Sequence, residues 1–290
     1  MKKIALLIGL MFMNSVFSSD GSHTYTLATG TLGSERLALQ DKVLSAQSYL
    51  HLEKAGLSEG MVVYEIGCGN GMMTTYIANK VGANGHVYAL DISQAQIDLA
   101  KERIQAQVLS NVTFVLADIN HENTLPLGKA DIVYSRFVLM HLQTPANAIT
   151  KMKTYLKPGG VVASQESIMK TWHTTYQPEI FDDYVNKMIA LGQLYGVDYN
   201  LGQNLDVLYK KEGFDKVAVY YHQQSIAPGD AKKLILLGMA EKRPRTLEAN
   251  IVSPKAFELW EKAAQAIPED DTSFTYNMAK QAYVLAWNEK

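Results

Sequence analysis

The stretch that most constrains the fold is VVYEIGCGNGMMT, residues 62–74, in which an apolar run leads directly into a glycine-rich turn. The run Val62–Ile66 predicts a buried strand, and the residues after the turn place Met73, Ile77 and Val81 on one face of a helix. A turn without side chains lets a ligand approach backbone N–H groups at the start of a helix. The stretch therefore predicts a strand, a ligand-binding turn and a helix.

The same alternation of strand and helix continues along the chain. Apolar runs typical of strands, separated by segments with helical periodicity, occur at residues 86–90, 112–116, 132–134, 161–164 and 216–222. Strands that alternate with helices predict an α/β fold with a doubly wound, mostly parallel sheet and helices on both faces.

The periodicity also suggests how the chain is divided. Residues 22–56 are expected to form an N-terminal lid and helix, and residues 57–167 the ligand-binding core. Between 168 and 212 the pattern changes to helix-like segments rich in Tyr, Met and Leu, which predicts an inserted helical cap. Residues 213–290 are expected to complete the core and add further helices.

The first residues have the layout of a secretory signal peptide. Two lysines precede an apolar run at residues 4–13, and small polar residues follow up to a cleavage position before Ser19. Residues 1–18 are therefore expected to direct export, and the apolar run is too short for a stable membrane anchor. The alternative is an N-terminal tail on a cytoplasmic enzyme.

Composition excludes several classes of function. The 27 Lys and Arg nearly balance the 29 Asp and Glu, without a run of like charges, so nucleic acid is not an expected partner. The single cysteine, Cys68, rules out an internal disulfide and leaves too few thiols for a structural zinc site, and no metal is expected. Nothing in the sequence indicates the oligomeric state.

The glycine spacing and the acid that follows it indicate a nucleoside ligand. Gly67, Gly69 and Gly71 follow the pattern G-x-G-x-G, whereas the dinucleotide fingerprint places its third glycine one residue later, where Met72 stands. About twenty residues after the turn, Asp91 ends the next strand, where a carboxylate can accept both ribose hydroxyls. The alternative is that Asp91 is an ordinary helix N-cap.

A second acid follows the third predicted strand. Asp118 lies in NVTFVLADIN, at the same level of the sheet as Asp91. Because the carboxyl ends of parallel strands meet at one edge, both acids are expected at one crevice. An ordinary turn residue is the alternative for Asp118.

These features together resemble the class I S-adenosylmethionine-dependent methyltransferases. Five segments carry the resemblance, in the same order as in that family: EIGCGNG, ALDIS, VLADI, DIVYSRFVLMHL and LKPGG. They lie between about Tyr25 and Glu166. The resemblance implies a Rossmann-like, seven-stranded sheet, with S-adenosyl-L-methionine as the cofactor and a methyl acceptor as the second substrate.

The resemblance also implies roles around the ribose and methionine. Gly67, Cys68 and Gly69 would line this part of the cofactor, and Asp91 would bind the ribose. Glu65 would hold the amino group or a nearby water.

On the adenine side, the resemblance implies that Ile92 packs on one face of the ring. Asp118 would accept the exocyclic amine, the backbone of Ile119 would meet a ring nitrogen, and Arg136 would face the methionine end. The upstream segment resembles a lid, which makes Tyr25, Arg36 and Gln40 candidates for cofactor binding. A solvated helix face is the alternative for Arg36 and Gln40.

Methyl transfer from a sulfonium needs mainly alignment and exclusion of water, with a base only where the acceptor must lose a proton. His141 and Glu166 are the first catalytic candidates, and Tyr25, His173 and Tyr176 are others. A packed histidine is the alternative for His141, and orientation of the cofactor or substrate is the alternative for Glu166.

The segment after the fourth predicted strand reads SRFV and lacks the Asn-Pro-Pro-Tyr pattern of methyltransferases that act on nucleic acid amines. With an aromatic, Met-rich cap, a small-molecule acceptor is favoured. Two other classes stay open: an NAD-dependent dehydrogenase, which the glycine spacing disfavours, and a non-catalytic or exported binding protein.

Overall fold

The computed structural model describes residues 31–120 and 128–289. The signal-like segment at residues 1–18 and the lid candidate Tyr25 lie outside the described residues. No helix in the described part is long and apolar enough to cross a membrane.

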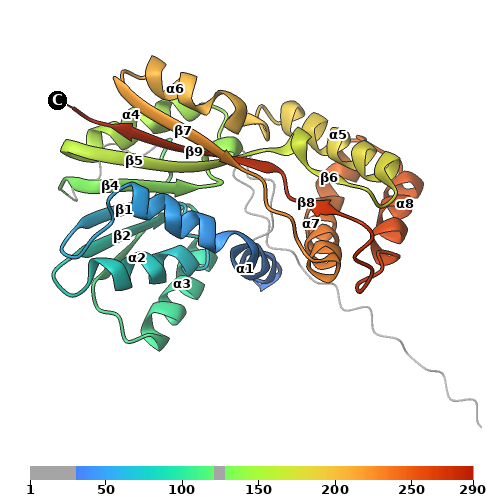
Figure 1. The fold of residues 1–290 in the computed structure, drawn as a ribbon, viewed down its shortest axis with the longest axis horizontal. Coiled ribbons are helices and arrows are strands. Elements are labelled where there is room, and N and C mark those ends of the chain that lie inside the picture. The colour runs from blue at the N-terminus through green and yellow to red at the C-terminus, as the bar shows by residue number, and fades with distance from the viewer. Residues whose placement is uncertain (1–30, 121–127, 290) are drawn as a thin grey trace, which may run out of the picture.

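Seven strands of the described chain form one sheet in the order β3-β2-β1-β4-β5-β9-β7 (Figure 1). Neighbours from β3 to β5 are parallel, and β9 runs antiparallel to both β5 and β7. The predicted mostly parallel, doubly wound sheet is confirmed. The strands are β1 (Val62–Ile66), β2 (His86–Asp91), β3 (Val112–Leu116), β4 (Ala130–Arg136), β5 (Leu156–Ile168), β7 (Lys216–His222) and β9 (Lys280–Trp287).

Helices cover both faces of the sheet, as predicted. Successive side chains of a strand point to opposite faces. Val63 accordingly packs with the helices of one face and Tyr64 with those of the other. Helices α1 (Thr31–Lys54), α2 (Met72–Val81) and α3 (Gln94–Ala106) lie on one side, and α4 (Pro145–Tyr155) and α6 (Leu205–Lys211) on the other (Figure 1). Short 3-10 turns occur at η1 (Leu139–His141), η2 (Met169–Thr171) and η3 (Leu201–Asn204).

A second apolar core lies beside the sheet, in a helical cap. Its helices are α5 (Pro178–Leu194), α7 (Pro228–Glu248) and α8 (Pro254–Gln265), joined by the small pair β6 (His173–Thr174) and β8 (Tyr276–Asn277). The largest side chains at its centre are fully buried and include Phe181, Phe257 and Trp260.

The cap differs in extent from the predicted insertion at residues 168–212. Helix α6, which falls in that range, packs on the sheet through the buried side chains of Leu205 and Tyr209. The cap is completed instead by α7 and α8, from the region expected to add helices to the core. Helical periodicity shows which face of a helix is apolar. It does not show which of the two apolar cores that face packs against, so the extent of the cap could not be read from the pattern.

Candidate cofactor and active site

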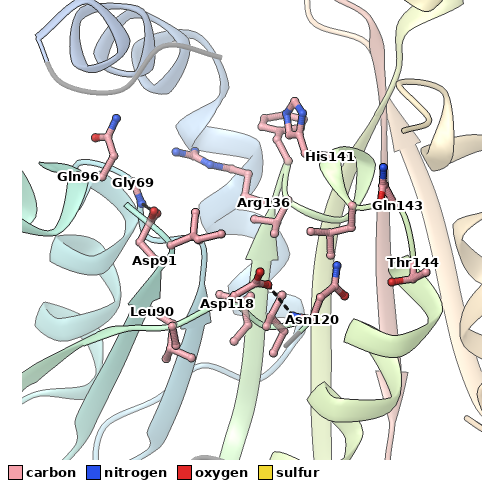
Figure 2. A pocket seen from close by; sticks show the side chains of 18 of the residues that line it. Gly69, Leu90, Asp91, Gln96, Asp118, Asn120, Arg136, His141, Gln143 and Thr144 are labelled. Carbon is pink, nitrogen blue, oxygen red and sulfur yellow. Dashed lines mark hydrogen bonds between the residues drawn. The ribbon is translucent and has the colours of Figure 1, made fainter. Parts of the chain in front are cut away.

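A cavity of about 360 Å³ lies at the carboxyl ends of β1, β2 and β4 (Figure 2). The strands and the loops after them supply most of its walls, and α1 adds Leu37. Of the predicted site residues, the cavity is lined by Gly67, Gly69, Asp91, Ile92, Asp118, Ile119, Arg136 and His141.

The glycine turn forms one wall of the cavity in a conformation that suits glycine alone. Gly67, Gly69 and Gly71 all have positive φ, at 73°, 53° and 79°. An added Cβ at Gly67 would collide with the Val138 side chain, and one at Gly71 would lie 2.9 Å from Cβ of Ala100. The turn therefore packs closely against the fourth strand's loop and α3, and no side chain of its own fills the space above it.

Asp91 is fixed by the turn. Its Oδ2 accepts the N–H of Gly69 at 2.8 Å, and its Oδ1 accepts the N–H of Ser93 at 2.9 Å. Burial raises the pKa of this carboxyl, and the backbone N–H donors oppose the shift. Ser93, rather than Asp91, is the N-cap of α3, because its hydroxyl accepts the Gln96 N–H. The N-cap alternative for Asp91 is thus removed, and a carboxylate with two anchored oxygens faces the cavity.

Beside the end of β2, the loop after the neighbouring strand β3 brings Asp118, Ile119 and Asn120 to the lining. Asp118 Oδ1 accepts the backbone N–H of Asn120 at 2.8 Å, which is the turn role foreseen as the alternative (Figure 2). Asp118 can serve both in the turn and in the cavity lining, because its bond to the Asn120 N–H uses one carboxylate oxygen. Ile92, 41% exposed, and Ile119 supply apolar surface beside it.

Arg136 lines the cavity and is anchored behind it. Its Nη2 forms an ion pair with Asp41 Oδ1 at 2.9 Å, and its Nη1 donates to Ser48 Oγ at 3.3 Å. Both partners lie on α1, so the guanidinium joins the end of β4 to the first helix.

Two residues predicted to touch the cofactor lie behind the lining. Glu65 is buried and accepts the Thr74 hydroxyl at 2.6 Å, and burial raises its pKa to about 8. The buried Cys68 points its Sγ at the Gly69 carbonyl, 3.8 Å away, and burial raises its thiol pKa. Alternation along β1 explains the position of Glu65, because it neighbours the cavity-lining Ile66 and points to the other face of the sheet, whereas Cys68 lies in the turn after the strand.

The lid candidates Arg36 and Gln40 also lie away from the cavity, and neither belongs to a solvated face. Arg36 Nε donates to both carboxylate oxygens of Glu241 on α7, each at 2.9 Å, and its Nη1 donates to Gln40 Oε1 at 2.7 Å. Leu37, the next residue on α1, is the one that reaches the cavity and the turn at Gly69.

Glu166, a catalytic candidate from the sequence, accepts hydrogen bonds from three backbone N–H groups in the structure. The side chain is fully buried and absent from the cavity lining. Its Oε1 accepts the N–H groups of Val138 and Leu139 at 3.0 and 2.8 Å, and its Oε2 accepts that of Met140 at 3.2 Å. Burial raises its pKa to about 8 against these three donors. Glu166 therefore holds the backbone of the segment after β4, a role that differs from both the catalytic role and the orientation of cofactor or substrate expected from the sequence.

His141 lies at the end of the segment that Glu166 holds and lines the cavity. Its ring meets Tyr199 edge-on, with centroids 5.6 Å apart. Burial, then the charges of Lys242 and Arg36, lower its pKa to about 3, so the imidazole is neutral at neutral pH. The other candidates do not reach the cavity lining: His173 is exposed on β6, and the Tyr176 hydroxyl donates to the Ala266 carbonyl at 2.9 Å.

Several lining residues were not foreseen. Phe137 and Val138 lie within DIVYSRFVLMHL, so that segment contained the signal for them. Gln96, buried in the first turn of α3, and Gln143, after η1, had no distinguishing pattern.

A parallel sheet closed by one antiparallel strand, a glycine turn at the end of β1 and an acid that faces the cavity at the end of β2 define a class I S-adenosylmethionine-dependent methyltransferase. The family model described as "Methyltransferase domain" matches residues 57–212. The chain belongs to this family.

Curated relatives match part of the chain. The (S)-coclaurine N-methyltransferase of Thalictrum flavum subsp. glaucum is 28% identical over 153 residues, which are 51% of this chain and 40% of the relative. Phosphoethanolamine N-methyltransferase 1 of Zea mays is 37% identical over 112 residues, which are 38% of this chain and 21% of the relative. The matched part is thus less than half of each relative's length.

Solved structures with similar folds cover more of the chain. A putative methyltransferase from Bacillus halodurans C-125 superposes with a TM-score of 0.54 at 15% identity, over 83% of this chain and 98% of that one. A putative sarcosine dimethylglycine methyltransferase from Galdieria sulphuraria gives a TM-score of 0.51 at 13% identity, over 92% and 94%. These likenesses establish the shared fold.

S-adenosyl-L-methionine is the cofactor of this class, and the described residues fit it. Gly67 and Gly69 bring backbone without side chains to the cavity wall, and the Asp91 carboxylate faces the same cavity. Ile92 and Ile119 flank Asp118 with apolar surface suited to a purine.

Proposed function

We propose that the protein transfers the methyl group of S-adenosyl-L-methionine to a small-molecule acceptor. The observation that carries the proposal is one continuous cavity with nucleoside-binding acids at one end and His141 at the other (Figure 2). The names of the curated relatives, a coclaurine and a phosphoethanolamine N-methyltransferase, support an acceptor of small size.

The residues of the chain have separable tasks in this reaction. Asp91 accepts the ribose hydroxyls, Asp118 and the Ile119 backbone recognise the adenine edge, and Arg136 faces the methionine end. When bound, the cofactor supplies an electrophilic sulfonium methyl group. His141, neutral and packed edge-on against the Tyr199 ring, offers a ring nitrogen to the acceptor.

The experiment combines binding with turnover. Calorimetry with S-adenosyl-L-methionine, S-adenosylhomocysteine and NAD should show binding of the first two and none of NAD. Transfer of labelled methyl groups to a panel of small amines, phenols and acids should then give product. Binding of NAD alone would contradict the proposal, and cofactor binding without turnover across the panel would favour the non-catalytic class.

We also propose that residues 1–18 direct export of the protein, a proposal that rests on their sequence alone. Mass spectrometry of the protein from its native cells should find Ser19 at the N-terminus. An intact residue 1 on the mature protein would refute it.

A further inference from the structure

One buried side chain in the wall of the cavity has a polar atom without a hydrogen-bond partner. Gln96 lies in the first turn of α3, lines the cavity and is 5% exposed. Its Oε1 is buried and has no hydrogen-bond partner in the described part of the chain. A buried amide oxygen without a donor is destabilising, and such atoms are rare in folded proteins. Gln96 therefore marks a place where a ligand can supply the missing donor.

The structure of α3 does not account for an amide at this position. The backbone N–H of Gln96 donates to Ser93 Oγ at 3.4 Å, and Ser93 is the N-cap of the helix. This cap uses only the backbone of Gln96. A methionine side chain would fill a similar volume without burying an unpaired oxygen. The amide is thus a feature of the cavity wall and not a requirement of the helix.

Gln96 lies on the face of α3 that packs against the glycine turn. Side chains three and four positions apart are neighbours on a helix, so Gln96 and Ala100 share a face. A Cβ at Gly71 would lie 2.9 Å from Cβ of Ala100, and Arg103 Nε donates to the Asn70 carbonyl oxygen at 3.0 Å. These contacts fix the helix against the turn. The amide of Gln96, one helical turn before Ala100, is therefore held beside the turn.

A short series of hydrogen bonds also connects Gln96 with Asp91. The N–H of Ser93 donates to Asp91 Oδ1 at 2.9 Å, and Ser93 Oγ accepts the N–H of Gln96. Figure 2 shows Gln96, Gly69 and Asp91 on one side of the cavity. Because Asp91 is the residue assigned to the ribose hydroxyls, Gln96 borders the space in which a ribose would lie.

We propose that the Gln96 amide binds a ribose hydroxyl of the cofactor, as a second ribose-binding residue beside Asp91. The inference rests on the proposed function, because it requires S-adenosyl-L-methionine in this cavity. The hydroxyls are the hydrogen-bond donors of the cofactor next to Asp91, since its exocyclic amine is assigned to Asp118 and its amino group belongs to the methionine end. A carboxylate can only accept hydrogen bonds, whereas the glutamine amide both accepts from a hydroxyl and donates to one. Gln96 therefore supplies the donor that Asp91 lacks.

The first test measures the affinity for S-adenosylhomocysteine by calorimetry. Gln96→Met removes the amide with little change in side-chain length, and the dissociation constant should rise about 5- to 20-fold. Gln94→Met is the matched control. Gln94 is exposed in the same helical turn, and its amide donates to Asp98 Oδ1 at 2.7 Å. The control should bind within about twofold of wild type, and equal binding by Gln96→Met would overturn the inference.

Analogues of the ligand show which group Gln96 binds. The loss of affinity in Gln96→Met should shrink for S-adenosylhomocysteine analogues that lack the 2′- or the 3′-hydroxyl, for at least one of the two. It should persist in full for methylthioadenosine, which keeps the ribose and lacks the carboxyl and amino groups of methionine. An equal loss for the parent ligand and both deoxy analogues, or no loss for methylthioadenosine, would place the amide elsewhere and overturn the inference.

Thermal stability separates ligand binding from a packing role. Gln96→Met removes a buried unpaired oxygen, so the Tm of the ligand-free protein should stay unchanged or rise. The increase in Tm on adding S-adenosylhomocysteine should become smaller, because the variant binds it more weakly. A lower ligand-free Tm with an equal loss for all analogues would assign Gln96 to packing alone. Failure of the wild-type protein to bind S-adenosylhomocysteine would instead be a failure of the proposed function.

Discussion

Replacing Asp91 by asparagine tests the ribose assignment, because it changes the charge and one donor while keeping the shape. In the structure each carboxylate oxygen accepts one backbone N–H, from Gly69 at 2.8 Å and from Ser93 at 2.9 Å. An asparagine keeps one of these bonds and turns an NH₂ group towards the other donor. It also loses the charge that strengthens the bonds to both ribose hydroxyls.

The magnitudes follow from these bonds. A hydrogen bond to a charged group contributes about 1.5–3 kcal/mol, so losing most of the charge-assisted pair should weaken cofactor binding by about 3 kcal/mol. At 1.4 kcal/mol per tenfold, this is roughly a 100-fold rise in the dissociation constant. The backbone donor left facing an NH₂ group costs about 1–3 kcal/mol of stability, which lowers Tm by several degrees in a domain of this size.

Calorimetric titration with S-adenosylhomocysteine, together with a thermal melt of each protein, measures both effects. Asp98→Asn is the matched control, since Asp98 is an exposed acid of α3 whose Oδ1 accepts the Gln94 side-chain amide at 2.7 Å. A folded Asp91→Asn protein that binds within threefold of wild type would refute the ribose assignment.

Three further predictions concern stability, cofactor affinity and pH dependence. Glu166→Gln should destabilise the protein by about 2–4 kcal/mol in urea unfolding, because the new NH₂ group would face a buried backbone donor. A variant that is stable but has lost all activity would instead indicate a catalytic role for Glu166. Gly67→Ala should weaken cofactor binding at least 10-fold by calorimetry, because the new methyl group collides with Val138 and glycine alone suits this φ. Unchanged affinity would show that the cofactor does not bind at this turn. The depressed pKa of His141, about 3 against 6.5 in the unfolded chain, means that the unfolded state binds more protons between these values. The free energy of unfolding should therefore fall as pH drops below about 6.5, by about 1.4 kcal/mol per pH unit from this residue. Urea unfolding at pH 5 and pH 7 should show that His141→Asn removes this contribution to the pH dependence.

The parts of the site that sequence could predict are those in which backbone geometry dictates the residue type. Gly67 and Gly71 are needed because their φ values are positive and their neighbours leave no room for a side chain. Asp91 follows from its place at the end of a strand next to that turn. Such local demands leave a pattern in a single chain, and the class of the fold follows from the same pattern.

What the sequence could not show depends on contacts between distant segments. Arg36 has a spacing that suits a cofactor lid, yet its partner is Glu241, 205 residues further along the chain. Glu166 lies near the carboxyl end of β5, where a catalytic acid could stand, but the fold brings it the N–H groups of a segment that begins at Val138. Neither contact leaves a pattern in the sequence around the residues that make it, so neither could be predicted without the structure.

The way the cap is connected to the sheet limits how this protein could adapt to a different ligand. Between β5 and β9 the chain leaves the sheet for the cap at η2, returns at η3, leaves again at α7 and returns at β9. Four connections therefore tether the two cores, and a large swing of the cap about a single hinge would strain all of them together. A different ligand is more readily accommodated by substituting side chains where the two cores meet. Replacing the whole cap by that of another protein would require exchanging two separate segments of the chain together.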